Sequence, residues 1–166
     1  MRYVTGAVIA FLLALVQASS IEQFKVLGVT PNLMLVLLAC WLVVRGLDDV
    51  LPMMLVAGVT FGLVGLQEPG VVLLALLPLA LLGVLRELHI VHSEALLALV
   101  LVALASLAYE SVMLAAVMAD GGSLDVATAA REVIAPVAIV NLTMTLPVYV
   151  VMRLARPVES RHRLSY

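Results

Sequence analysis

Long apolar runs, separated by short breaks that hold most of the charges, dominate this sequence of 166 residues. Hydrophobic residues make up 64% of the chain and charged residues 12%, against about 45–50% and about 25% in soluble domains. A domain of this size cannot hide so much apolar surface from water, which excludes a soluble globule and a disordered chain. Aromatic residues make up only 5%, which favours lipid-facing helices over an outer-membrane β-barrel with aromatic girdles. We therefore predict an all-α, polytopic membrane protein.

Six of these runs are candidate transmembrane helices, each of which needs about 20 apolar residues. They cover residues 3–19, 31–44, 50–66, 71–85, 95–118 and 133–154. The breaks between them are short, and no stretch is left over for a soluble domain. We therefore expect a single six-helix transmembrane domain over residues 1–166. Because the second, third and fourth runs are short, a partly re-entrant course for them is the alternative.

The basic residues fall mostly on one side of such a six-helix chain. Only Lys25 and Arg131 fall on the other side. The side shared by both termini holds Arg2, Arg45, Arg86, Arg153, Arg156, Arg161 and Arg163. Lys and Arg accumulate on the cytoplasmic side of membrane proteins, so both termini are expected to be cytoplasmic. The chain has no basic tract of the kind that binds nucleic acid, and its expected environment is the lipid bilayer.

Glu110 is the only acidic residue well inside a predicted span. It lies about 12 Å below the outer boundary at 1.5 Å per residue, where an ionised carboxylate costs about 2.5–3.5 kcal/mol. It is therefore expected to face protein or water, either as a proton-relay or ligand-binding carboxylate or as an anchor between helices or to a partner. Asn141 lies at a similar depth in the last run. We predict that the two side chains approach each other, with Tyr109 or Thr143 nearby.

Three glycines share one face of the third run: Gly58, Gly62 and Gly65 are spaced i, i+4, i+7. The Gly-x-x-x-Gly pair lets a neighbouring backbone approach closely because no Cβ stands between the helices. The sequence leaves two alternatives open for this face. It either binds another protein or packs against a helix of the same chain.

Residues with catalytic or metal-binding chemistry are scarce. His89 and His92 have a spacing that zinc could use, but an interfacial loop is the alternative because no cysteine lies nearby. Cys40 is the only cysteine, so no disulfide framework exists. The sequence contains no nucleophile elbow, Walker loop or His-Glu-x-x-His motif. We expect a protein that is not an enzyme and that carries no cofactor and no metal.

Two segments together resemble MreD, a family of bacterial rod-shape-determining membrane proteins. The first is Gly28-Val29-Thr30-Pro31-Asn32-Leu33-Met34-Leu35, in which a Pro-Asn pair opens the second run. Proline suits a helix start, and the Asn32 amide can satisfy backbone donors there. The second runs from Val140 to Tyr149 and on to Arg153, with the Asn, Pro and Arg of the family's closing pattern at Asn141, Pro147 and Arg153.

The chain length, the number of apolar runs and the small loops are also similar to those of the family. One position departs from the family's pattern. The family commonly has an acid after the glycines of its third span, whereas Gly65 here leads into a turn that contains Glu68. We therefore assign no role to Glu68 from the resemblance.

The resemblance implies a multi-pass subunit of the cell-elongation (rod) complex in the bacterial inner membrane. It implies binding to an MreC-like protein and, through it, to a RodA-type glycosyltransferase and a class B penicillin-binding transpeptidase, with MreB filaments on the cytoplasmic side. Such a subunit supports lateral peptidoglycan synthesis and cell shape. The family also resembles the substrate-binding S-components of energy-coupling-factor (ECF) vitamin transporters, which implies a compact bundle and a rival function in small-molecule binding.

The sparse aromatic residues argue against a vitamin pocket, which usually needs aromatic stacking and several convergent polar groups. Tyr3 and Tyr166 lie at the chain ends, and Trp41 lies near the cytoplasmic end of its run. A proton-driven transporter would need paired ionisable groups and repeat symmetry, and neither is visible in the sequence.

Overall fold

The structure is a computed structural model that describes residues 2–19, 25, 28–65, 67–87, 93–122 and 125–155. These residues form helices and connecting turns, so the all-α prediction is confirmed for the described part of the chain. The six principal helices are α1 (Arg2–Ser19), α2 (Leu33–Arg45), α3 (Leu47–Val64), α4 (Pro69–Leu82), α6 (Glu94–Ala119) and α8 (Ala135–Leu154). Three short elements complete the set, namely α5 (Val84–Glu87), α7 (Val126–Ala129) and the π-helix η2 (Ala130–Ile134).

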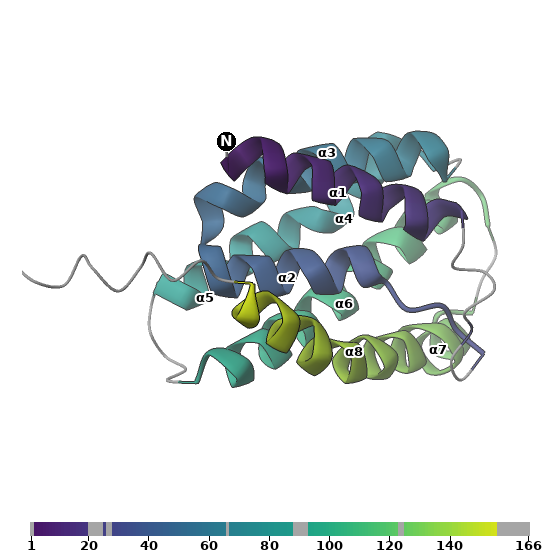
Figure 1. Ribbon diagram of the computed structural model, residues 1–166. Helices are drawn as coiled ribbons and strands as arrows, with labels where there is room; N and C mark the ends of the chain where they lie inside the picture. Colours follow the sequence, from purple (N-terminus) through teal and green to yellow (C-terminus); the bar gives the residue numbers. More distant parts are fainter. Residues whose placement is uncertain are drawn as a thin grey trace, which may run out of the picture.

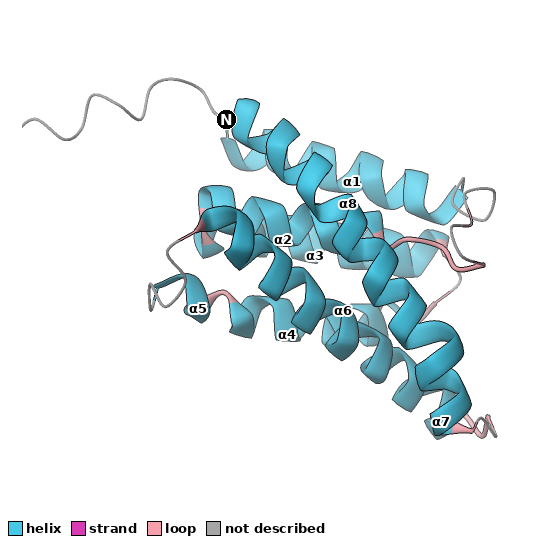
Figure 2. Cartoon of the chain, turned by 90° about the horizontal axis from the view of Figure 1, so that it is seen from below, coloured by secondary structure: helices cyan, strands magenta, loops and turns pink. Residues whose placement is uncertain are grey.

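Helix α2 is the central helix of the bundle. It contacts α1, α3, α6 and α8, and the other principal helices surround it in the order α1, α3, α4, α6 and α8 (Figures 1 and 2). Nine of its thirteen residues are buried. A helix that is apolar on every side belongs inside a protein, which explains why this run has no polar face.

Principal helices that follow one another along the chain run in opposite directions, so the start of α1, the end of α2 and the end of α8 lie at one end of the bundle (Figure 1). Among the described residues, three helical segments are long and apolar enough to cross a membrane: Leu47–Val64, Glu94–Ala119 and Val126–Leu154. The apolar parts of α1, α2 and α4 are shorter. Large apolar side chains are exposed on the outer helices, Leu63, Leu81 and Leu154 among them. An outer surface of this kind suits lipid better than water.

Helix α3 begins three residues earlier than the sequence predicts. Asp48 and Asp49 lie in its first turn, where carboxylates stabilise the positive end of the helix dipole. The charges that were expected to separate the second and third runs therefore belong to a helix. Gly46 alone makes the connection, with a φ of 104° that favours glycine.

The fourth and sixth runs also differ from the predicted spans. The fourth is interrupted at Gly83, which separates α4 from α5. A Cβ at this position would lie 3.1 Å from Leu47 Cδ1, so glycine allows close packing against the start of α3. The sixth begins as α7, because the Asp125 carboxylate accepts hydrogen bonds from the N–H groups of Ala127 and Thr128 and caps the helix.

Candidate functional site

The start of α2 lies inside the protein, where its free backbone N–H groups need partners. The first N–H groups of any helix have no acceptor within the helix. Asn32 is the N-cap residue, and its Oδ1 accepts a hydrogen bond from the Leu35 N–H at 3.0 Å. The predicted capping role of the Asn32 amide is thus confirmed, while Pro31 precedes the cap instead of beginning the helix.

Gln17 of α1 holds the same turn from a second direction. Its Nε2 donates to the Pro31 carbonyl at 3.0 Å, and its Oε1 accepts from the Leu33 N–H at 3.0 Å. The side chain is buried and uses both ends of its amide. Gln17 is not among the residues predicted from the sequence, although a glutamine two residues before the end of an apolar helix is a signal for such a contact.

Asn141 of α8 joins three helices at this point. Its Oδ1 accepts the Asn32 N–H at 2.8 Å, and its Nδ2 donates to Ser106 Oγ of α6 at 2.9 Å. Asn141 is fully buried and Ser106 almost so. Tyr109 is buried on the next turn of α6, beside Asn32. We call Gln17, Asn32, Ser106 and Asn141 the α2-start cluster.

The predicted pairing of Glu110 with Asn141 is wrong. Asn141 binds Ser106, which lies one helical turn before Glu110 on α6. The estimated depth correctly predicts that Asn141 lies inside the bundle. Its partner on α6 lies one helical turn, about 5.4 Å, from the predicted partner. Glu110 instead lies on the wall of a groove that forms between α6 and the α7–η2 segment.

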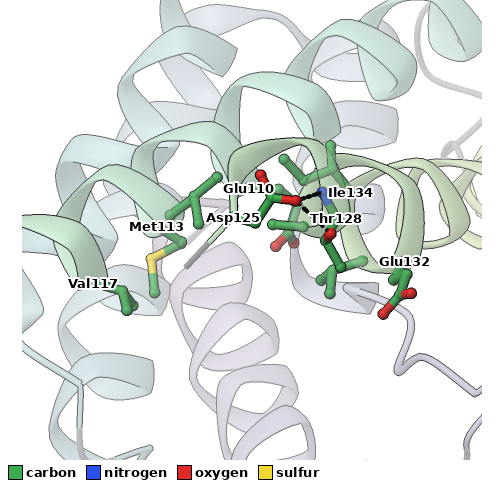
Figure 3. A pocket seen from close by; sticks show the side chains of 10 residues that line it. Glu110, Met113, Val117, Asp125, Thr128, Glu132 and Ile134 are labelled. Carbon is green, nitrogen blue, oxygen red and sulfur yellow. Dashed lines mark hydrogen bonds between the residues drawn. The ribbon is translucent and has the colours of Figure 1, made fainter. Parts of the chain in front are cut away.

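This groove has a volume of about 360 Å³ and mostly apolar walls. Glu110 and Met113 of α6 lie on one side, with Thr128 and Ile134 from the other segment across from them (Figure 3). Asp125 and Glu132 also line it, and no basic residue is among the described residues that do so. Glu110 lines a second, more polar hollow of about 470 Å³ together with Lys25. We call the first cavity the Glu110 groove.

Asp125, at the entrance to this segment, is fixed by its neighbours. The Thr128 hydroxyl donates to its Oδ2 at 2.6 Å, and the backbone N–H groups of Ala127 and Thr128 donate to the same carboxylate. These hydrogen bonds lower the pKa of Asp125. The Glu110 groove therefore carries a fixed negative charge at this position.

Gly58 and Gly62 face α4 of the same chain. A Cβ on Gly58 would lie 2.6 Å from Leu73 Cδ2, and one on Gly62 would lie 2.5 Å from the backbone Cα of Pro69. Packing within the bundle therefore accounts for both residues. Gly65 does not face α4 in this way. It is the C-cap residue of α3, and its N–H donates to the Phe61 carbonyl.

The remaining family-motif residues lie on the surface of α8. Pro147 and Arg153 are both exposed, and Arg153 is in the last turn, where a cation complements the helix dipole. His89 and His92 lie outside the described residues. Within the described part of the chain, no three His, Cys, Asp or Glu side chains are grouped so that they could hold a metal ion.

In comparisons with known proteins, no protein-family model, no curated protein and no solved structure matches this chain. Its class therefore follows from the fold alone: the described part of the chain is all-helical, with three helical segments able to cross a membrane by length and composition.

Proposed function

We propose that this chain is a non-catalytic membrane subunit of the bacterial cell-elongation (rod) complex, of the MreD type, and that it binds an MreC-like protein. The observation that carries this proposal is the buried contact between Asn32 and Asn141, which lie 109 positions apart. The resemblance depends on two distant segments, and this contact gives both segments one structural task. That task is to fix the start of the central helix against α8.

The proposed subunit crosses the inner membrane six times, with both termini in the cytoplasm. The alternating direction of the principal helices supports this arrangement. So do the charges: Arg45, Arg86 and Arg153 belong to the ends of α2, α5 and α8 at one end of the bundle, whereas Arg131 belongs to η2 at the other. Helix α2 has only 13 residues, about 20 Å. The surrounding helices bury nine of its thirteen residues, so it need not span the hydrocarbon alone.

The Glu110 groove is the proposed contact surface for a transmembrane helix of the MreC-like partner. Its apolar walls suit the side chains of such a helix. Glu110, Asp125 and Glu132 are complementary to a basic residue near the end of that helix. The glycine face is not offered for this contact, because α4 already covers Gly58 and Gly62.

Co-purification from mild detergent tests the proposal. The tagged full-length chain is expected to recover an MreC-like protein. Ala129→Phe places a large side chain in the Glu110 groove and is expected to lower the recovery about tenfold or more, equivalent to about 1.4 kcal/mol of binding free energy. Ala130→Phe is the matched control, because Ala130 follows Ala129 at the start of η2, is exposed and does not line the groove.

Three outcomes are decisive. Equal recovery with both variants would show that the partner binds another surface. Recovery of neither an MreC-like nor a RodA-like protein by the unchanged chain would contradict membership of the rod complex. Tight binding of a vitamin in that case would establish the S-component function instead.

A further inference from the structure

A second groove lies near the end of the bundle at which α1 begins and α8 ends. It has a volume of about 310 Å³ and is bounded by α1, α2 and α8. Ile9 of α1 forms part of one wall, and Val151 and Met152 of α8 form part of the other. Trp41 and Arg45 of α2 also line it. We call this cavity the Trp41 groove.

Arg45 carries the only charge among the described residues that line the Trp41 groove. The Arg45 guanidinium lies over the Trp41 ring, 5.6 Å from its centroid, and the Arg45 side chain is exposed. No carboxylate is among the described residues that line the groove. The groove thus offers a cation beside apolar walls.

The position of the groove indicates what it can bind. Arg45 is the last residue of α2, so its charge lies at an end of the bundle, while Ile9 and Val151 continue the apolar wall along α1 and α8. Val151 is 66% exposed, so this wall is open to molecules outside the protein. Tryptophan and arginine commonly lie at the boundary between hydrocarbon and headgroups. Basic pockets between transmembrane helices bind anionic lipid headgroups.

We propose that the Trp41 groove binds one anionic phospholipid, whose phosphate pairs with Arg45 and whose acyl chain packs between α1 and α8. The acyl chain covers Ile9, Val151 and Met152. A free phosphate ion would satisfy Arg45 but would leave the apolar walls uncovered. The site therefore takes a lipid in preference to the inorganic ion.

The chain contains a single tryptophan, so Trp41 fluorescence reports directly on this groove. The full-length protein is reconstituted into phosphatidylcholine nanodiscs that contain either phosphatidylglycerol or phosphatidylcholine with brominated acyl chains, at equal mole fraction. Bromine quenches tryptophan only at close range, so the two quenching curves give the relative affinity for the two lipids. We expect phosphatidylglycerol to bind about fivefold more tightly, the factor that corresponds to about 1 kcal/mol for one basic residue near the surface.

Arg45→Gln is expected to bring this ratio close to one, because it removes the charge and keeps a side chain of similar length. Arg153→Gln is the matched control: Arg153 is exposed on the last turn of α8 and does not line the groove. The ratio compares two lipids within one variant, so a change in the intrinsic fluorescence of Trp41 does not affect it. Excess inorganic phosphate is expected to leave the quenching unchanged.

The proposal is overturned if the unchanged protein is quenched equally by both brominated lipids. It is also overturned if Arg153→Gln lowers the ratio as much as Arg45→Gln does, since the preference would then reflect general surface charge. Relief of quenching by inorganic phosphate would identify the ion, not the lipid, as the ligand.

Discussion

Replacing Asn141 with leucine is expected to lower the free energy of unfolding by about 2–6 kcal/mol, because two buried partners are each left without a hydrogen bond at about 1–3 kcal/mol. These partners are the Asn32 N–H and Ser106 Oγ. Leucine has the same branched arrangement of four side-chain heavy atoms as asparagine, so the main loss is polar and not a cavity. Unfolding of the purified protein in mixtures of mild detergent and dodecyl sulfate measures the change.

Two further variants show whether the loss comes from these contacts. Thr143→Ala is the control, because Thr143 is exposed and its hydroxyl binds only the Val140 carbonyl of its own helix. Ser106→Ala combined with Asn141→Leu is expected to cost less than the sum of the two single changes, whereas Glu110→Gln combined with Asn141→Leu is expected to be additive. Equal stability of the Asn141 and Thr143 variants would refute the role of Asn141 in the α2-start cluster.

Replacing Gly62 with alanine is expected to cost about 1–3 kcal/mol, the usual range for overpacking a buried contact. The added Cβ would lie 2.5 Å from Cα and 2.9 Å from N of Pro69. Both are backbone atoms, so α3 and α4 must separate at the point where they meet. Unfolding in the same detergent mixtures gives the size of the effect.

Gly70→Ala is the matched control for this change. Gly70 lies next to Pro69 on α4, but a Cβ there meets no atom within 4 Å. Alanine also favours a helix over glycine, so this variant is expected to be at least as stable as the unchanged protein. Equal destabilisation by the two substitutions would show that close α3–α4 packing does not depend on Gly62.

Much of the fold follows from the sequence, because the apolar runs can only be helices and the breaks between them are rich in charge or glycine. The central position of α2 does not follow in the same way. Its apolar residues cover every side of the helix, so the periodicity that would identify one buried face is lost. Only the contacts of α2 with four other principal helices identify it as the centre.

Only the part of the candidate site that depends on local sequence could be predicted. The capping role of Asn32 depends on local sequence, and it could be predicted from the residue type alone. The partner of Asn141 depends on the relative positions of α6 and α8, and a shift of one turn exchanges Ser106 for Glu110. The role of Gln17 was not predicted, because a polar residue near the end of an apolar run is also expected at the boundary of a transmembrane span.

The grooves could not be predicted because each is built from segments that are distant in sequence. The Trp41 groove needs α1, α2 and α8 together, and the Glu110 groove depends on the π-helical segment before α8. The π-helix has no sequence signal of comparable strength to an apolar run, since it differs from an α-helix only in its hydrogen-bond spacing.

Cysteine labelling in intact cells tests most directly whether this chain crosses the membrane with both termini in the cytoplasm. Cys40 is buried and is replaced by alanine, and single cysteines then replace the exposed residues Lys25, Asp48 and Arg131. A membrane-impermeant maleimide is expected to label positions 25 and 131 in intact cells and position 48 only after permeabilisation. Labelling of position 48 in intact cells, or equal labelling of all three, would contradict the proposed arrangement.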